Sequence, residues 1–293
     1  MNKVSLQGVI DMHVHTNPDL RHRAYDDFEL TDAAVRVGAR AIVIKTHQGM
    51  TMDRAYLCNA YNQRVNHGSN NFTMFGSITM NKVIGGINPV AVETALKLGA
   101  KVVWLPTASA RNHIEKLNLD RKKCVEVVRD GKVVPEMNDV FQLVKDHDAV
   151  LGTAHVSPEE CFVVVEAARK AGVKKIVVTH PEWWLVNMSV EDQVRMVKDY
   201  DVILERCYAQ NMGGGKYKSN LPSNLEIIQT VGYEHVMVDT DGGQVENPHW
   251  ELALQEYMQY LVDHGIPEEH VYHMTHTIPA GLLGLEDGEE TGR

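Results

Sequence analysis

The chain has 293 residues, a length that suits one or two ordinary domains and that a single α/β barrel also reaches. Hydrophobic residues make up 44% of the chain and charged residues 23%, so it can bury a large core and is not intrinsically disordered. The net charge of −10 argues against nucleic acid and anionic membranes as partners, because both carry negative charge. We therefore expect a small-molecule substrate, and a homo-oligomer stays open.

The four cysteines occur without any CxxC spacing, which excludes a zinc ribbon and argues against a disulfide framework. The beginning of the chain contains no apolar stretch of the kind found in signal peptides, and no run approaches about 18 consecutive apolar residues. These features favour a cytoplasmic protein with reduced thiols, and they indicate neither secretion nor a membrane span.

Short apolar runs rich in β-branched residues alternate with segments of helical periodicity along the whole chain. The runs predict strands over residues 8–13, 39–45, 72–78, 101–105, 149–154, 174–179, 201–205 and 235–239. Helices are predicted over residues 31–37, 52–67, 89–98, 138–145, 158–170, 190–198, 223–231 and 250–264. Eight such repeats predict an α/β fold, a (β/α)8 TIM barrel, as a single domain over residues 1–293. An open doubly wound sheet is the alternative, but no GxGxxG motif follows the first strand to support it.

Two segments interrupt the alternation of strands and helices. Residues 122–135 predict a small hairpin around Asp130-Gly131, inserted in a loop between a strand and a helix. Residues 208–222 contain three consecutive glycines, Gly213 to Gly215, and predict a long flexible loop. These glycines lack the GK[ST] ending of a phosphate-binding loop, so the phosphate signal is weak.

Histidines gather where the predicted strands end. In a barrel of this kind the chemistry lies at the C-terminal ends of the strands. Five of the fifteen histidines and one aspartate occupy such ends: His13, His15, His47, His155, His180 and Asp241. His13 and His15 are two residues apart, so a strand would present both to the same side. Imidazole and carboxylate ligands suit Zn²⁺ best, with Mn²⁺ or Fe²⁺ as alternatives.

Each of these histidines taken alone is more often an ordinary surface or hydrogen-bonded residue than a ligand. Their combination predicts a shared metal site, with His13, His15, His155, His180 and Asp241 as ligands for one or two ions.

The same arrangement resembles the amidohydrolase superfamily of metal-dependent (β/α)8 barrels. Its motif is His-x-His after strand one, His after strands five and six, and Asp after strand eight. The closing segment 277–285 is similar to the one that ends many such barrels, with Ile278 where Asn is usual. Residues 13–16, 44–47, 85–89, 104–110 and 241–244 more narrowly resemble a little-characterised branch, catalogued as a domain of unknown function. No long stretch precedes strand one, so the small β-sandwich of many members is not expected.

Binuclear members of the superfamily carry a carboxylated Lys or a Glu at the end of strand four, where this chain reads Leu105-Pro106-Thr107. Lys45, at the end of strand two, is the residue that could replace it. As a carbamate Lys45 would be a metal ligand, and as an ammonium it would bind substrate. The sequence leaves both roles open.

The resemblance implies hydrolysis of an amide, ester, lactone or related C–N bond of a small metabolite through a metal-activated water. Asp241 is expected to be the general base, with Asp239 as the competitor; superfamily members place the reactive carboxylate at the position of Asp241. Lys45 and His47 are expected to orient substrate or stabilise an oxyanion. A metal-dependent decarboxylase or C–C lyase is the alternative, followed by a phosphoesterase and, last, a non-catalytic metal-binding protein.

Three further residues are candidates for substrate binding: Arg21, His113 and Glu205. Arg21 follows the first strand and suits a carboxylate, although an ordinary solvated arginine is the simpler interpretation. His113 lies in the loop after strand four, and Glu205 ends strand seven, where it could instead orient a ligand histidine. Trp104, Trp183 and Trp184 near the same rim suggest a partly apolar substrate or mere packing.

Overall fold

The computed structural model describes residues 3–285, and eight parallel strand positions make up its centre. In chain order these are β1 (Ile10–Val14), β2 (Ala41–Ile44), β3 (Thr73–Phe75) continued by β4 (Ser77–Thr79), β5 (Val102–Trp104), β8 (Val150–Gly152), β9 (Lys175–Val178), β10 (Ile203–Cys207) and β13 (Val236–Asp239). Each lies within two residues of a strand predicted from the sequence. The apolar runs were reliable because both faces of such strands are buried.

The strands follow one another around the sheet in chain order. One ladder runs β1-β2-β3 and the other runs β4-β5-β8-β9-β10-β13, and β3 and β4 are separated only by Gly76. The first and last strands are linked by a parallel bridge between Val14 and Gly242, and Met12 N donates to Asp239 Oδ1 at 2.9 Å. This order is that of a TIM barrel, so the predicted fold class is confirmed.

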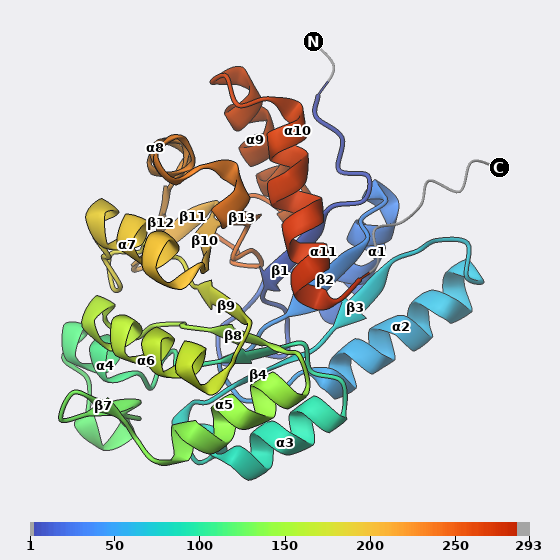
Figure 1. Cartoon of the computed structure of the whole chain (residues 1–293). Helices are drawn as coiled ribbons and strands as arrows, with labels where there is room; N and C mark the ends of the chain where they lie inside the picture. The colour runs from blue at the N-terminus through green and yellow to red at the C-terminus, as the bar shows by residue number, and fades with distance from the viewer. Residues whose placement is uncertain (1–2, 286–293) are drawn as a thin grey trace.

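Helices follow the strands and cover the outside of the sheet (Figure 1). They are α1 (Asp27–Val37), α2 (Met52–Asn66), α3 (Pro89–Lys97), α5 (Glu136–Asp146), α6 (Pro158–Ala171), α7 (Val190–Tyr200), α8 (Leu221–Val231) and α9 (Trp250–Asp263). Several begin at strong caps: Ser157 and Glu160 form a capping box on α6, as Asp26 and Glu29 do on α1. None of the helices among residues 3–285 has the length and apolarity that crossing a membrane requires.

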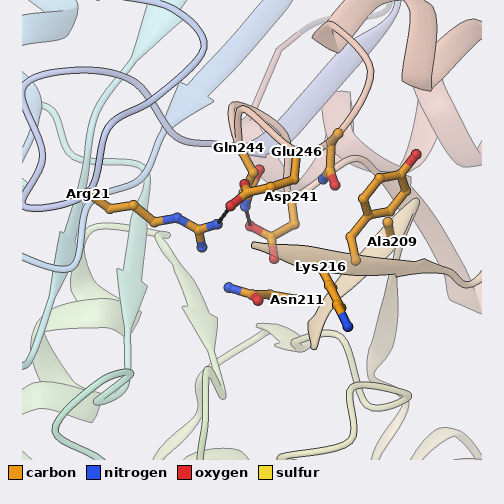
Figure 2. A pocket seen from close by; sticks show the side chains of 9 residues that line it. Arg21, Ala209, Asn211, Lys216, Asp241, Gln244 and Glu246 are labelled. Atoms are coloured by element: carbon orange, nitrogen blue, oxygen red, sulfur yellow. Dashed lines mark hydrogen bonds and ion pairs between the residues drawn. The ribbon is translucent and has the colours of Figure 1, made fainter. Parts of the chain in front are cut away.

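Some elements differ from the sequence prediction. Residues 208–222 contain an antiparallel hairpin, β11 (Ala209–Gly213) and β12 (Lys216–Ser219), where a flexible loop was expected. Its glycines form the turn, and the hairpin helps to line a pocket beside Asp241 (Figure 2). The shorter elements that the sequence did not predict are α4 (Arg111–Lys116), α10 (Glu268–Tyr272), a π-helical turn (His273–Thr277), α11 (Ile278–Leu283) and the 3-10 turns Lys82–Ile84, Arg121–Lys123 and Tyr233–His235. A single turn is too short to show helical periodicity.

The hairpin predicted around Asp130-Gly131 has the strands β6 (Val128–Arg129) and β7 (Lys132–Val133). It lies between η2 at Arg121–Lys123 and α5, on the strand-to-helix side of the chain after β5. The hairpin therefore occupies a connection and leaves the order of the barrel strands unchanged.

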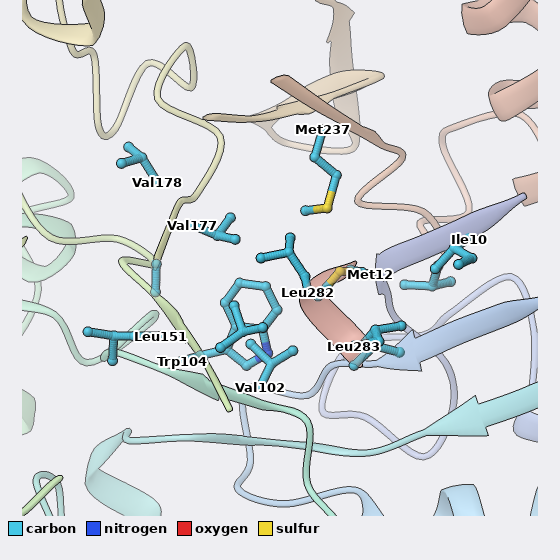
Figure 3. Packing of buried hydrophobic residues seen from close by; sticks show 14 of the residues in the cluster. Ile10, Met12, Val102, Trp104, Leu151, Val177, Val178, Met237, Leu282 and Leu283 are labelled. Carbon is cyan, nitrogen blue, oxygen red and sulfur yellow. The ribbon is translucent and has the colours of Figure 1, made fainter. Parts of the chain in front are cut away.

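Trp104 at the end of β5 fills the middle of the barrel (Figure 3). It is fully buried, and Figure 3 shows it among Val102, Leu151 and Val177. The neighbouring strand makes room for the indole with Gly152, where an added Cβ would lie 2.2 Å from Trp104 Cε3. Trp104 in turn supports the site, because Lys45 Nζ lies 4.3 Å from its ring centroid.

We expect Gly152→Ala to lower the free energy of unfolding by about 1–3 kcal/mol, because the new methyl group must displace the indole of Trp104. Urea denaturation monitored by tryptophan fluorescence and circular dichroism measures the change. Gly281→Ala is the matched control: a Cβ at Gly281 in α11 meets nothing within 4 Å, so stability should stay the same or rise. Equal stability of Gly152→Ala and wild type would contradict this packing argument.

Candidate metal centre

Two histidines of the first strand and one aspartate after the last strand form the tightest group of ligand atoms. His13 Nε2 and His15 Nε2 lie 3.3 Å apart, and each lies 3.2 Å from Asp241 Oδ1. Both imidazoles are buried, and the Asp241 side chain is 24% exposed. Around a tetrahedral zinc with bonds of about 2.0–2.1 Å, neighbouring ligand atoms stand about 3.3 Å apart. The spacing of these three atoms therefore matches that of ligands around one metal ion.

Closure of the barrel brings these residues together. His15 N donates to Gly242 O at 2.9 Å, which ties the loop after β13 to the end of β1. The approach is so close that a Cβ on Gly243 would lie 1.7 Å from His15 O, and Gly243 also has a φ of 96°. Only glycine fits there. The turn places Asp241, itself in the left-handed region with a φ of 49°, against the two imidazoles.

Glu205 in β10 orients His13. The carboxylate is fully buried, and its Oε1 lies 3.1 Å from His13 Nδ1. Because a carboxylate only accepts hydrogen bonds, His13 must donate from Nδ1, which leaves a lone pair on Nε2 for a metal. Glu205 Oε2 accepts from the backbone N of His180 at 3.2 Å, so the carboxylate itself is held. Of the two roles that the sequence offered Glu205, these contacts favour orientation of His13 over contact with substrate.

Burial keeps the histidines of the site neutral. His15, His47, His155 and His180 each have a pKa well below the ordinary value of 6.5, first because of burial and then because of neighbouring positive charges. A neutral imidazole has a free lone pair, which is the form that binds a metal. His15 Nδ1 and His180 Nδ1 are buried without a hydrogen-bond partner among residues 3–285.

His155 and His180 lie next to the tight group. Their ring centroids are 5.2 Å apart, and the His180 ring is 5.8 Å from that of His13. Trp183 packs against both, at 4.5 Å from His155 and 5.1 Å from His180. The backbone is strained at this place, because His180 has a φ of 28°, a conformation that non-glycine residues rarely adopt. The structure thus brings the predicted ligands into one cluster, in which His180 lies beside His13 and His155 lies beside His180.

His47 and His113 extend the cluster. The His47 ring lies 4.9 Å from that of His15 and 5.9 Å from that of His155, and Thr107 Oγ1 holds its Nδ1 at 2.8 Å. His113 Nδ1 lies 3.0 Å from His155 Nδ1, and burial lowers the pKa of His113 to about 4. The sequence placed His113 in a loop, but the short helix α4 carries it to His155.

Lys45 lies inside the group. Its side chain is buried, and Nζ stands 2.9 Å from His13 Nε2, the atom that also faces Asp241. Burial lowers the pKa of Lys45, although the charges of Glu205 and Asp241 oppose the shift. The lowered pKa favours the neutral amine, which is the form that carbon dioxide converts to a carbamate. The carbamate and the ammonium roles predicted for Lys45 both remain compatible with this position.

The structure separates Asp241 from its competitor Asp239. Asp239 is fully buried, accepts a hydrogen bond from Met12 N, and has a pKa well above its ordinary value because of burial and the charges of Asp11 and Glu205. A raised pKa disfavours the ionised form of Asp239, and its burial keeps the carboxyl away from solvent water. Burial alone would raise the pKa of Asp241, but His13, His180 and Lys45 hold it below its usual value. Asp241 is therefore ionised and partly accessible, as the expected base requires.

These donors fit a divalent metal. His13, His15 and Asp241 would hold one ion with nitrogen and oxygen atoms, as zinc, manganese and iron sites do. His13, Glu205 and Cys207 form a second group whose atoms are close enough to hold one ion, but these atoms are less suited to bind a metal. Burial, with the charge of Glu205, raises the pKa of the Cys207 thiol well above its usual value, and His13 Nδ1 is already bonded to Glu205.

Arg21 lies farther out than the other predicted residues. It lines the pocket beside Asp241, and its Nη2 lies 2.5 Å from Glu246 Oε1 (Figure 2). Trp184, named for a partly apolar substrate, donates from Nε1 to Asn211 O at 2.8 Å, as Trp183 does at 3.1 Å. The two indoles therefore tie the loop after β9 to the β11–β12 hairpin.

Comparison with known families and structures supports the resemblance predicted from the motifs. The model of a "Family of unknown function (DUF6282)" matches residues 8–205. Among curated proteins no sequence match was found. An amidohydrolase from Pseudomonas aeruginosa superposes with a TM-score of 0.66 at 12% identity, covering 94% of this chain and 95% of the other.

Two further solved structures have the same fold and different activities. An organophosphorus hydrolase from Deinococcus radiodurans has a TM-score of 0.59 at 14% identity, covering 96% of this chain and 93% of its own. A dihydroxybenzoic acid decarboxylase from Polaromonas sp. JS666, with bound manganese, has a TM-score of 0.54 at 12% identity, covering 98% and 100%. The family match agrees with the branch of unknown function that the motifs indicated, and at these identities the likeness to the solved structures shows a shared fold.

We predict that the metal-free protein loses stability as the pH falls below about 6.5. The unfolded chain would then protonate His15, His47, His155 and His180, whereas in the folded protein their lowered pKa values keep them neutral. The unfolded state therefore binds more protons, and the free energy of unfolding falls by up to about 1.4 kcal/mol per pH unit for each histidine. Urea titrations between about pH 7.5 and pH 5 in the presence of EDTA measure it.

His47→Gln should reduce the pH dependence of the free energy of unfolding by the contribution of one histidine, up to about 1.4 kcal/mol per pH unit. His147→Gln is the control, since His147 is exposed at the end of α5 and should leave the slope unchanged. A free energy of unfolding that stays constant over this pH range would refute the prediction.

Proposed function

Because the chain belongs to the family of unknown function DUF6282, membership names no activity, and we propose one from the site itself. The protein is a metal-dependent hydrolase that cleaves an amide, ester, lactone or related C–N bond of a small metabolite. The observation that carries the proposal is the mutual contact of His13 Nε2, His15 Nε2 and Asp241 Oδ1 within 3.3 Å. The hydrolases that share the fold support it.

A bound divalent cation supplies Lewis acidity: it lowers the pKa of water toward neutrality and polarises a carbonyl oxygen. Asp241 is the base of the reaction. Its Oδ1 faces His13 and His15 and accepts from Gln244 Nε2 at 3.2 Å, so Oδ2 is the atom that takes a proton from water and returns it to the leaving group. Glu205 keeps His13 in the tautomer that has its lone pair on Nε2.

His47 and Lys45 act on the substrate in this proposal. Thr107 Oγ1 holds His47 Nδ1, which leaves Nε2 to orient substrate or to stabilise developing negative charge. Lys45 serves the same end as an ammonium, or supplies a further ligand as a carbamate. His155 and His180 complete the ligands, for one or two ions. Zn²⁺ is the preferred metal, with Mn²⁺ and Fe²⁺ as alternatives.

A decarboxylase on the same barrel is the second candidate. The observation that favours it is the end of β5, where Leu105-Pro106-Thr107 offers no carboxylate or lysine to bridge two ions. A single ion is compatible with decarboxylation, and the manganese-containing decarboxylase among the similar structures supports the alternative. A phosphoesterase follows, because few cations surround the site. A cytoplasmic location and a homo-oligomer stay predictions.

We expect His13→Ala to lose bound metal, because it removes Nε2 from the tight group and leaves Glu205 Oε1 without its histidine partner. Protein purified with added Zn²⁺ should contain about one or two ions per chain for wild type and less than a tenth of that for the variant. Inductively coupled plasma mass spectrometry measures the content. His147→Ala, an exposed histidine, should keep the full content. A metal-free wild type, or a fully loaded His13→Ala, would sink the proposal.

Asp241→Asn should lower kcat by about 10²–10⁴-fold, because an amide keeps an oxygen at Oδ1 but cannot take a proton. The assay is a panel of amide, lactone, carboxylate and phosphate compounds, followed by release of amine, acid, carbon dioxide or phosphate. Metal content is measured in the same samples, so that loss of the ion and loss of the base are told apart. Release of carbon dioxide without any hydrolysis would contradict the hydrolase proposal and support the decarboxylase.

A further inference from the structure

A small pocket lies beside Asp241, and we call it the mouth pocket. The β11–β12 hairpin, the loop after β13 and the loop after β1 form its walls (Figure 2). The residues used below are Arg21, Lys216, Gln244, Glu246 and Asn247, all of which line it with Asp241. The pocket is small, so it admits only the polar end of a substrate whose reacting bond lies at Asp241.

Two cationic side chains face the mouth pocket. Arg21 is 36% exposed and meets Glu246 through Nη2 alone, so the other N–H donors of its guanidinium remain for a ligand. Lys216 pairs with β11 through its backbone, whereas its side chain is exposed and has no hydrogen bond or ion pair with any of residues 3–285. One arginine and one lysine at the edge of a pocket suit a carboxylate, which accepts charge-assisted hydrogen bonds from both.

Three oxygen atoms of the same loop lack donors. Gln244 Oε1, Glu246 Oε2 and Asn247 Oδ1 are buried and have no hydrogen-bond partner among the described residues. All three residues line the mouth pocket, and the Gln244 side chain is held there by its contact with Asp241. Buried acceptors are almost always paired in folded proteins, with protein groups or with water, so this wall can accept hydrogen bonds from a ligand that brings donors.

We propose that the mouth pocket binds the non-reacting end of the substrate, and that this end is a carboxylate with a hydroxyl or amino group close to it. Arg21 and Lys216 bind the carboxylate, while Gln244, Glu246 and Asn247 accept from the hydroxyl or amine. The assignment of this ligand as substrate rests on the proposed function. Ala209 and Tyr217 are the pocket residues that offer apolar surface, so the polar end replaces the partly apolar substrate suggested by the tryptophans.

The Glu246 carboxylate should also make the pocket select a carboxylate over a phosphate. It stands 2.5 Å from Arg21 Nη2 and would repel a doubly charged phosphate more than a singly charged carboxylate that carries a donor. Inorganic phosphate is therefore the competing anion to test.

The experiment uses three matched probes on the zinc-loaded full-length protein. These are 3-hydroxybutanoate, which has both groups, butanoate, which lacks the hydroxyl, and 3-hydroxybutanamide, which lacks the charge. Isothermal titration calorimetry or ligand-observed NMR gives each Kd. We expect 3-hydroxybutanoate to bind at least about tenfold more tightly than the amide and several-fold more tightly than butanoate and inorganic phosphate.

Lys216→Gln and Arg21→Gln each should weaken 3-hydroxybutanoate by about tenfold or more and leave zinc content unchanged. Lys218→Gln is the matched control, because Lys218 lies on the same strand but does not line the pocket. Arg21→Gln breaks the contact with Glu246, so its folding is checked by circular dichroism. Lys216→Gln removes no side-chain hydrogen bond or ion pair within residues 3–285 and keeps the test decisive if Arg21→Gln misfolds.

The inference is overturned if the amide or inorganic phosphate binds as tightly as 3-hydroxybutanoate, if none of the probes binds, or if Lys216→Gln leaves the Kd unchanged. Failure of the proposed function gives a different result. If the protein takes up no zinc, the hydrolase proposal falls, whereas selective binding that depends on Lys216 would still establish the mouth pocket as a carboxylate site.

Discussion

The closure of the barrel between its first and last strands is the contact on which the rest of the site depends. Gly243 lies so close to His15 O that no side chain fits, and His15 N bonds to Gly242 O. This contact sets Asp241 against His13 and His15, which come from the other end of the chain. The energy needed to hold Asp241 in a left-handed conformation comes from this packing, since the residue alone would avoid it. The ligand group therefore exists only when the barrel is closed.

Burial gives this group its chemistry. An exposed histidine is partly protonated near neutral pH, but the rings at this rim have pKa values well below 6.5 because they are cut off from water. Burial raises the pKa of the Asp239 carboxyl, whereas His13, His180 and Lys45 hold the pKa of Asp241 below its usual value. One environment thus favours neutral imidazoles, an ionised Asp241 and an Asp239 that is harder to ionise. Trp104 links the site to the barrel interior, because its indole packs against both Gly152 and Lys45.

The site has an inner and an outer part with different demands. In the inner part each ligand needs a fixed tautomer, and Glu205 supplies it for His13. The outer part is lined by the β11–β12 hairpin and the loop after β13, which we propose to recognise the substrate. The indoles of Trp183 and Trp184 connect the two, because they hold Asn211 O of the hairpin while Trp183 packs on His155 and His180. A change of hairpin sequence can alter selectivity without changing the metal ligands, as is common in barrels of this class.

The sequence by itself predicted the barrel and most of the residues that gather at its rim. Apolar runs mark strands buried on both faces, and His13, His15, His155, His180 and Asp241 lie where those strands end, so local pattern was sufficient. Only the tertiary structure decided which of them meet. Alternation along a strand could not tell Asp239 from Asp241, because the positive φ at Asp241 changes its direction. Nor could sequence place Glu205 under His13, carry His113 to His155, or reveal a hairpin at residues 208–222, since each depends on contacts between segments far apart in the chain.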